Sequence, residues 1–203
     1  MKRLLLLLTL VALWSYLRAD VRPARVFADH MVLQRGQPVP VWGWAKPGEK
    51  ITLTFNGQTL RTQAAKDSTW RIDLVPMQAG GPFTMTLAGK KNTVTLQDIL
   101  IGEVWICSGQ SNMEWPLSQT RDAEAEIAAA NYPQIRQLYV RHEIAMSPRK
   151  DLPNGAWTAC SPQTAGEFTA VGYFFARKLQ QELGVPIGLI NTNWGGTEVE
   201  TWI

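Results

Sequence analysis

Between residues 20 and 98 the chain alternates hydrophobic and polar positions over short runs. The alternation is strict over residues 51–55 (ITLTF) and 83–87 (FTMTL), where every second side chain is apolar. A period of two puts the apolar side chains on one face of a β-strand and the polar side chains on the other. The pattern therefore predicts half-buried strands over residues 39–44, 51–55, 59–63, 70–74, 83–87 and 93–96.

Turn-forming residues separate these runs. Asn56-Gly57 stands between two of them, and Ala79-Gly80-Gly81-Pro82 precedes a third. Asn-Gly favours the positive φ angles of a tight hairpin turn, so it predicts that the two flanking strands pair. Short strands at this spacing are typical of a small β-sandwich, and we assign residues 20–98 to such a domain.

From residue 99 onwards the pattern changes to strands that alternate with helices. Apolar runs predict strands over residues 99–107, 135–140 and 187–190, and longer periodic segments predict helices over 122–130 and 167–183. Strand–helix–strand repetition is typical of a parallel sheet with helices on its faces. We therefore expect an α/β fold class, with the parallel sheet in a second domain over residues 99–203.

The helix predicted over residues 167–183 has recognisable ends. Thr164 and Glu167 have the spacing of a capping box, and Gly184 and Pro186 follow the last turn. The apolar positions that we expect to face the core are Phe168, Val171, Phe175, Leu179 and Leu183, with Phe174 beside them.

The first 19 residues have the organisation of an export signal. Lys2 and Arg3 precede an apolar run over residues 4–13, and Ala19 offers a small residue for cleavage. The alternative is a membrane anchor, but the run is short for a bilayer span. We expect a cleaved signal peptide, a periplasmic or extracellular location, and no stable membrane insertion after cleavage.

Removal of this leader changes the charge balance. The whole chain has 20 Lys and Arg against 17 Asp and Glu, and the leader contributes Lys2, Arg3 and Arg18 but no acid. The remaining chain has 17 of each sign, so its net charge gives no reason to expect nucleic acid as a partner.

The two cysteines, Cys107 and Cys160, leave two interpretations open. In an oxidising compartment they could form a disulfide, whereas the apolar strand before Cys107 favours a free, buried thiol. Neither has a second Cys or a His at the spacing of a metal site. We expect neither a metal nor another cofactor.

Two of the predicted strands end in turns that suggest chemistry. Residues 99–107 lead into Ser108-Gly109-Gln110-Ser111-Asn112, and residues 187–190 lead into Asn193-Trp194-Gly195-Gly196-Thr197. Ligand sites of parallel sheets lie beyond the carboxyl ends of the strands. Ser111 is our candidate nucleophile, and its own N–H together with that of Gly195 or Gly196 is our candidate oxyanion hole.

Side chains beside these turns are candidates for binding substrate. Tryptophan faces are common in sugar clefts, and Trp115 and Trp194 flank the two turns. We add the polar neighbours Gln110, Asn112 and Asn193 to the predicted substrate-binding set.

Other interpretations of the reactive groups are weaker. Met113 stands where a nucleophile elbow has its second glycine, which disfavours the α/β-hydrolase arrangement. An apolar environment would raise the pKa of Cys107 and make it a poor nucleophile. We expect His30 in the β-sandwich and His142 as a loop or surface residue, with a catalytic role for His142 as the weaker alternative. Glu198 and Glu200 are expected to be solvated or to cap a helix.

Three segments resemble the sialate O-acetylesterase family of the SGNH (GDSL-like) hydrolase superfamily. They are GEVWICSGQSNMEWPL, FADHMVLQRGQPVPVWGWAKPGE and IGLINTNWGGTEVETW. The resemblance implies a β-sandwich-like domain before a flavodoxin-like α/β/α domain. It also implies removal of acetyl groups from sugar hydroxyls. It makes Ser111 the nucleophile and places a glycine N–H of the NWGGT turn in the oxyanion hole.

The chain departs from the family pattern at its end. The family has its catalytic His, an Asp shortly before it and a third, polar oxyanion residue well after the glycine turn, whereas this chain stops at Ile203. We therefore expect an N-terminal part of a longer enzyme, with an incomplete sheet and little activity of its own. A non-catalytic carbohydrate-binding module is the alternative, and acetylated xylan is an alternative substrate.

Overall fold

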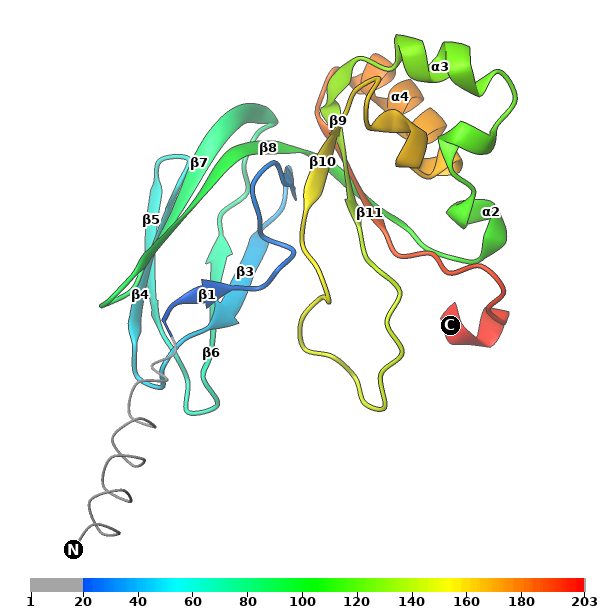
Figure 1. Ribbon diagram of the computed structural model, residues 1–203. Helices are drawn as coiled ribbons and strands as arrows, with labels where there is room; N and C mark the ends of the chain where they lie inside the picture. The colour runs from blue at the N-terminus through cyan, green and yellow to red at the C-terminus, as the bar shows by residue number, and fades with distance from the viewer. Residues whose placement is uncertain (1–19, 203) are drawn as a thin grey trace, which may run out of the picture.

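The computed structural model describes residues 20–202, so the predicted leader over residues 1–19 lies outside the described residues. A β-rich part and a part with helices lie side by side, joined by one long strand, β8 (Thr93–Cys107) (Figure 1).

The first part contains two facing sheets. One sheet has the order β1-β3-β6, and the other contains β5-β4-β7 followed by the first half of β8. The strands are β1 (Arg22–Pro23), β2 (Val32–Gln34), β3 (Val39–Trp44), β4 (Lys50–Phe55), β5 (Gln58–Gln63), β6 (Thr69–Leu74) and β7 (Gly80–Ala88). Apolar side chains from both sheets are fully buried, including Val41, Leu53 and Leu87. The predicted β-sandwich and its alternating strands are confirmed, and the Asn56-Gly57 hairpin pairs β4 with β5.

β8 continues through residue 98, where the sequence suggested a domain boundary. The strands predicted over residues 93–96 and 99–107 are one 15-residue strand. Within it Asp98 has φ 53°, in the left-handed region. Arg136, which is 5% exposed, donates hydrogen bonds to the backbone oxygen and the carboxylate of Asp98. The two parts are therefore joined by a continuous strand that a buried guanidinium holds.

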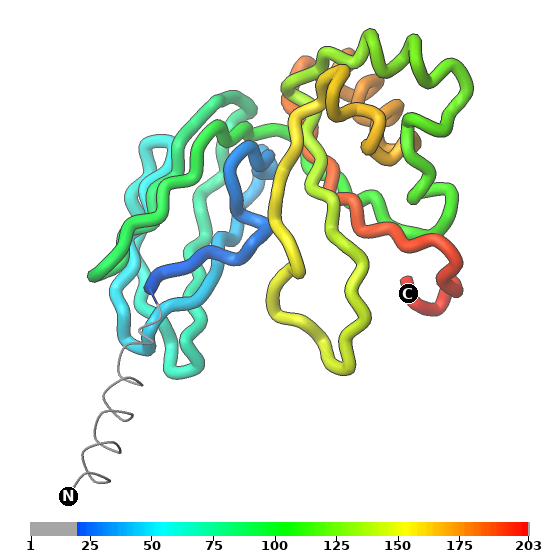
Figure 2. Tube along the Cα trace, in the orientation of Figure 1, coloured from blue at the N-terminus to red at the C-terminus, as the bar shows by residue number. Residues whose placement is uncertain are grey.

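The second part contains a sheet with the order β10-β9-β11-β8. Its further strands are β9 (Tyr132–Tyr139), β10 (Trp157–Cys160) and β11 (Ile187–Asn191). β11 is parallel to both β8 and β9, whereas β10 is antiparallel to β9. The expected α/β class with a parallel sheet is confirmed, but β10 was not predicted. A long loop over residues 140–156 connects β9 to β10 and runs between the first part and the segment after β11 (Figure 2).

Within residues 99–202, three helices and three short turns belong to this part, and the longest helix packs on one face of the sheet, against β9 and β11. The helices are α2 (Ser111–Glu114), α3 (Ala123–Ala129) and α4 (Ala170–Leu183), with short 3-10 turns η1 (Leu117–Gln119), η2 (Ala165–Glu167) and η3 (Val199–Trp202). The opposite face packs against the first part: the Trp157 indole N–H donates to Val26 O at 2.9 Å, and Gly188 lies against Val32. The sheet is thus covered by α4 on one side and by the β-sandwich part on the other.

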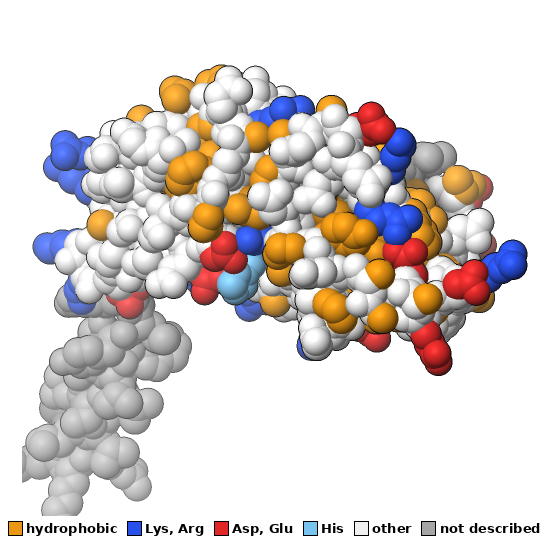
Figure 3. All heavy atoms as spheres, turned by 90° about the horizontal axis from the view of Figure 1, so that it is seen from above, with side chains coloured by type: hydrophobic (Ala, Val, Ile, Leu, Met, Phe, Trp, Pro, Cys, Tyr) orange, Lys and Arg blue, Asp and Glu red, His pale blue; other side chains and the backbone are white. Residues whose placement is uncertain are grey.

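The predicted apolar stripe of α4 is partly wrong. Tyr173 and Ala176 are fully buried, whereas Val171 and Phe175 are 48% and 40% exposed. Trp105 of β8 packs edge-on against Phe175, with 5.0 Å between the ring centroids. Hydrophobic side chains consequently gather on the surface of the half that carries α3 and α4 (Figure 3).

The predicted capping box is also wrong. α4 begins at Ala170, after the separate turn η2, and neither Thr164 nor Thr169 caps a helix with its side chain. The Thr164 hydroxyl instead donates to Ala159 O at 2.6 Å, which ties η2 to β10. The predicted helix end is confirmed, since Gly184 adopts the left-handed conformation after Leu183.

Cys107 and Cys160 are both buried and free. Burial raises the pKa of each thiol to about 11, so both are protonated at neutral pH and neither is an activated nucleophile. None of the helices within residues 20–202 is both long and apolar enough to cross a membrane.

Candidate active site

The fold brings the two predicted turns together. Thr192 N–H donates to Cys107 O at 2.9 Å, and Trp194 N–H donates to Gly109 O at 2.9 Å. These bonds continue the parallel β8–β11 pairing past the ends of the strands. Gly109 has φ 131°, a conformation that glycine adopts readily, and it turns the chain into α2. The carboxyl ends of two neighbouring parallel strands thus form one site.

Ser111 is the first residue of α2 and is exposed. It borders an open pocket of about 520 Å³ together with residues 108–113 and Val171. No described group accepts a hydrogen bond from its backbone N–H, because this N–H belongs to the first turn of the helix. A β-carbon placed on Gly195 would lie 3.7 Å from Ser111 Cα, so the second turn lies directly beside the candidate nucleophile.

The backbone N–H of Gly195 is already engaged. It donates to Glu114 Oε2 at 2.7 Å, and a β-carbon at position 195 would overlap with that carboxylate oxygen. Glycine is therefore required here by the approach of Glu114. Gly196 has φ 75°, and no described group accepts from its N–H. In this conformation the backbone N–H of Gly196 is available to a ligand, whereas the backbone N–H of Gly195 is bonded to Glu114.

His142 also belongs to this site, although the sequence favoured a loop or surface residue. Its Nε2 lies 2.8 Å from Asn193 O and 3.6 Å from Glu114 Oε1. Its ring stacks on Trp194 at 4.4 Å with an interplanar angle of 4°. A backbone carbonyl can only accept, so Nε2 is the nitrogen that carries a proton. His142 thus fixes the second turn from outside the two segments that form it.

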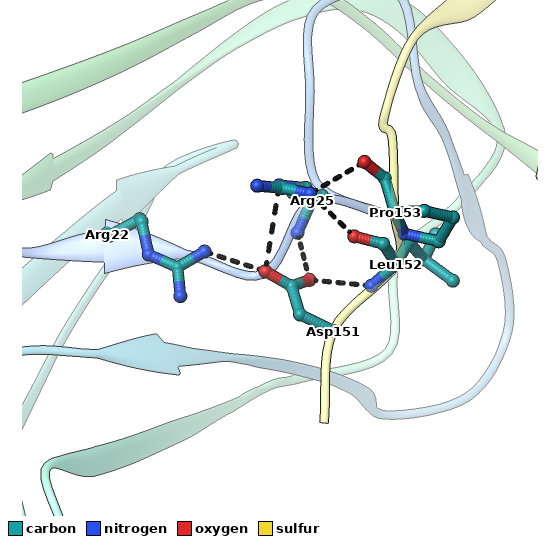
Figure 4. Close-up of polar contacts among 5 residues, drawn as sticks. All are labelled: Arg22, Arg25, Asp151, Leu152 and Pro153. Atoms are coloured by element: carbon teal, nitrogen blue, oxygen red, sulfur yellow. Dashed lines mark hydrogen bonds and ion pairs between the residues drawn. The ribbon is translucent and has the colours of Figure 1, made fainter. Parts of the chain in front are cut away.

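The loop that carries His142 is attached to the β-sandwich part (Figure 4). Asp151 Oδ2 lies 2.6 Å from the Arg22 guanidinium, and Asp151 Oδ1 accepts from the Arg25 N–H at 2.8 Å. The Arg25 side chain also donates to the carbonyls of Leu152 and Pro153, at 2.9 and 2.7 Å. The first part therefore positions one element of the site without contacting Ser111.

The remaining predicted substrate-binding residues have different surroundings. Gln110 and Asn112 are exposed at the start of α2 and border the same pocket as Ser111. Trp115 is 51% exposed, and its indole N–H donates to Gln119 O at 3.0 Å. Asn193 is only 1% exposed and donates to Met113 O at 3.0 Å, which connects the two turns. Trp194 is covered on one face by His142.

The other reactive side chains lie outside the site or are not grouped for catalysis. His30 Nδ1 lies 2.6 Å from Asp98 Oδ2, at the midpoint of β8. Glu198 and Glu200 are exposed, before and within η3. No group of three His, Cys, Asp or Glu within residues 20–202 is arranged to hold a metal ion.

Sequence reasoning did not identify Glu114 or His142 as site residues. Glu114 had a usable signal, because it follows Ser111 by one helical turn and so faces the same direction. His142 follows the carboxyl end of β9, a parallel neighbour of β11, and that position was the one available signal. Its contact with residues 193 and 194 spans 51 positions and has no local pattern.

Comparison with known proteins identifies the family of this chain. Residues 101–203 match the family model described as carbohydrate esterase, sialic acid-specific acetylesterase. The chain is 35% identical to the human sialate O-acetylesterase and 34% identical to the Pongo abelii sialate O-acetylesterase, and each match covers 94% of this chain. It spans about 40% of the length of these relatives.

A solved structure shows the same fold. The crystal structure of a carbohydrate acetylesterase from Xanthomonas citri superimposes with a TM-score of 0.87 at 43% identity, over 90% of this chain and 42% of that chain. The family match covers half of the chain and includes both turns of the site. This chain therefore belongs to the family of carbohydrate esterases described as sialic acid-specific acetylesterases.

Proposed function

We propose that the protein hydrolyses acetyl esters on sugar hydroxyls and that Ser111 is the nucleophile. The observation that carries the proposal is the pairing of the Ser111 turn with the Gly195-Gly196 turn at the carboxyl edge of one parallel sheet. Ser111 Oγ attacks the carbonyl carbon of the ester, the sugar hydroxyl leaves, and water then releases acetate from the acyl-enzyme.

The oxyanion is held by the N–H of Ser111 and by an N–H of the glycine turn. Gly196 offers an N–H that no described group occupies, whereas Gly195 can donate to substrate only after Glu114 moves away. Removal of one such donor costs roughly 100- to 1000-fold in rate. We assign no general base among residues 20–202, because His142 is bonded to Asn193 O and His30 to Asp98.

The domain organisation and location are part of the same proposal. Residues 20–98 form a β-sandwich domain that supports the hydrolase domain over residues 99–203, and the Asp151 contacts are the described link between the first domain and the site. The apolar leader with Lys2 and Arg3 supports export to the periplasm or the extracellular space. An acetylated sugar or glycan is the partner.

Acetate release by the full-length protein tests the nucleophile. O-acetylated sugars and p-nitrophenyl acetate serve as substrates, and the variants are Ser111→Ala and Ser118→Ala. We expect Ser111→Ala to lower kcat by on the order of 1000-fold or more, since loss of a nucleophile leaves only binding and oxyanion effects. Ser118 is an exposed serine of η1 and provides the matched control. Equal rates for the parent protein and Ser111→Ala would end the assignment.

A further inference from the structure

A second pocket of about 340 Å³ lies behind the two turns and shares Glu114 and Asn193 with them. Strands β9, β10 and β11 and the turn η2 contribute the side chains of Tyr139, Thr158, Asn191 and Glu167 to its lining. A volume of this order is within the range of small-molecule sites, roughly 300–1000 Å³. It shares no lining residue with the pocket that Ser111 borders.

Two carboxylates line this pocket, together with amide and hydroxyl groups that can both donate and accept. Glu114 and Glu167 are acceptors when ionised, and neither Lys nor Arg lines the pocket. Phe168 and Pro116 add an apolar surface of the kind that packs against the C–H groups of a sugar ring. The pocket therefore combines a negative charge with hydroxyl and amide groups and has no cation to receive an anion.

One buried acceptor in its wall has no partner. Asn193 is 1% exposed, and its amide nitrogen donates to Met113 O and to the Asn191 side chain. Within residues 20–202 no group donates to Asn193 Oδ1. Buried amide oxygens are normally hydrogen bonded, so this unpaired one, in a residue that lines the pocket, supports the expectation of a donor that enters the pocket.

Tyr139 is the complementary donor at this pocket. Burial and the nearby charge of Glu114 raise the pKa of its phenol, so the hydroxyl keeps its proton at neutral pH. No described group accepts from this hydroxyl within residues 20–202. It is available to a ligand oxygen.

We propose that this pocket binds an uncharged, hydroxyl-rich sugar unit of the acetylated substrate and disfavours units that carry a carboxylate. The proposal rests on the proposed esterase function, because it concerns the substrate of that site. Sugar hydroxyls donate to Glu114, Glu167 and Asn193 Oδ1 and accept from Tyr139. A carboxylate in the same place would face two like charges with no compensating cation, which disfavours its binding.

Binding to full-length protein in a Ser111→Ala background tests this without consuming the ligand. The probes are a monoacetylated methyl glucoside, which is neutral, and an O-acetylated N-acetylneuraminic acid, which carries a carboxylate. Affinity is measured by calorimetry. Tyr139→Phe removes one ligand contact, Glu167→Gln replaces a charged acceptor with a neutral one, and Glu124→Gln, at an exposed carboxylate of α3, is the matched control.

We expect the neutral sugar to bind more tightly than the acidic one. Tyr139→Phe and Glu167→Gln should each weaken its binding about tenfold, because the first removes a hydrogen bond and the second takes the charge from an acceptor. Glu124→Gln should leave affinity unchanged. Glu167→Lys should shift the preference toward the acidic sugar, because it replaces a repulsive charge with an attractive one. Unchanged thermal unfolding of each variant shows that it folds.

The proposed subsite and the proposed esterase function can fail independently of each other. Tighter binding of the acidic sugar, equal binding by the pocket variants, or no binding of either probe overturns the subsite, while Ser111-dependent acetate release would still support the esterase. Conversely, pocket-dependent binding of the neutral sugar without any acetate release by the parent protein supports the subsite and removes the proposed esterase function.

Discussion

The two parts of the molecule differ in how completely their apolar side chains are covered. In residues 20–98 both sheets turn their apolar faces inward, and Trp42 and Val75 are the large hydrophobic side chains that remain strongly exposed. In residues 99–202 Trp105, Ile106 and Phe175 are among many such side chains at the surface. The β-sandwich part buries the apolar side chains that its alternating pattern predicts to be buried. The second part has apolar surface that the described residues leave uncovered.

The largest expected effect compares a fully buried side chain of the first part with a partly exposed side chain of the second part. Leu53 of β4 is fully buried, so Leu53→Ala should lower the free energy of unfolding by about 3 kcal/mol through lost burial and a cavity. Phe175→Ala should cost only about 1 kcal/mol, since the ring is 40% exposed and mainly contacts Trp105. Urea unfolding followed by circular dichroism measures both values. Equal losses would mean that α4 is covered in solution by something outside residues 20–202.

The same difference explains what sequence alone could predict. The strands of the sandwich follow from local alternation, because each period-two run in residues 39–87 faces a partner sheet. The predicted apolar stripe of α4 was partly wrong because an apolar pattern does not show whether another element packs against that face of the helix. Phe168 packs in the core, yet Val171 three residues later is exposed. A pattern predicts the face of a helix but not what covers it.

The candidate site shows a second limit. Ser111 and the two glycines could be predicted because each follows a strand in the sequence, and the parallel sheet brings such ends together. Glu114 and His142 act through contacts with Gly195 and Asn193, 81 and 51 positions away. The His142 contact depends on the path of the loop over residues 140–156. That path in turn depends on Asp151 and the arginines of the first part.

The junction of the two parts gives the next largest effect. Arg136 is buried and donates to the backbone and carboxylate of Asp98 in the middle of β8. Arg136→Ala should lower the free energy of unfolding by about 2 kcal/mol, because it leaves acceptors without their charged donor. Arg71→Ala, which breaks an exposed pair with Asp73, should cost about 0.5 kcal/mol or less. Similar losses from both variants would show that the junction is not held by this contact.

The same contact makes a pH prediction. Burial opposes ionisation of Asp98, but hydrogen bonds from His30 and Arg136 hold its pKa below the ordinary value of 3.8. A depressed pKa stabilises the folded state above pH 3.8, and this contribution disappears as the pH falls through the folded pKa. Asp98→Asn should therefore destabilise the protein at pH 6, and this destabilisation should largely disappear in strong acid. Urea titrations at several pH values measure it, and a constant difference would contradict it.

A smaller effect is expected where the first part holds the loop. Asp151→Ala removes contacts to Arg22 and Arg25, yet these arginines are about half exposed, so the expected loss of stability is about 1 kcal/mol. Hydrogen exchange of residues 140–156 should increase, and His142 should become less ordered. Glu143→Ala breaks an exposed pair with Arg149 in the same loop and is the control. Unchanged exchange after Asp151→Ala would show that the loop does not depend on the first part.

The smallest expected effect on folding is at the uncovered edge of β8. β11 pairs with residues 103–107 along one edge, and within residues 20–202 no strand pairs with the other edge of that segment. Ile106 is 70% exposed there, so Ile106→Lys should change the free energy of unfolding by only about 0.5 kcal/mol.

An unpaired, apolar strand edge invites association with another chain, and a lysine on it opposes such pairing. Sedimentation velocity of the 203-residue chain at increasing concentration should show less self-association for Ile106→Lys than for the parent chain. Val75→Lys, at an exposed apolar position of the sandwich, should leave association unchanged. If both substitutions reduce association equally, general surface hydrophobicity is responsible, and the edge of β8 does not distinguish the two parts.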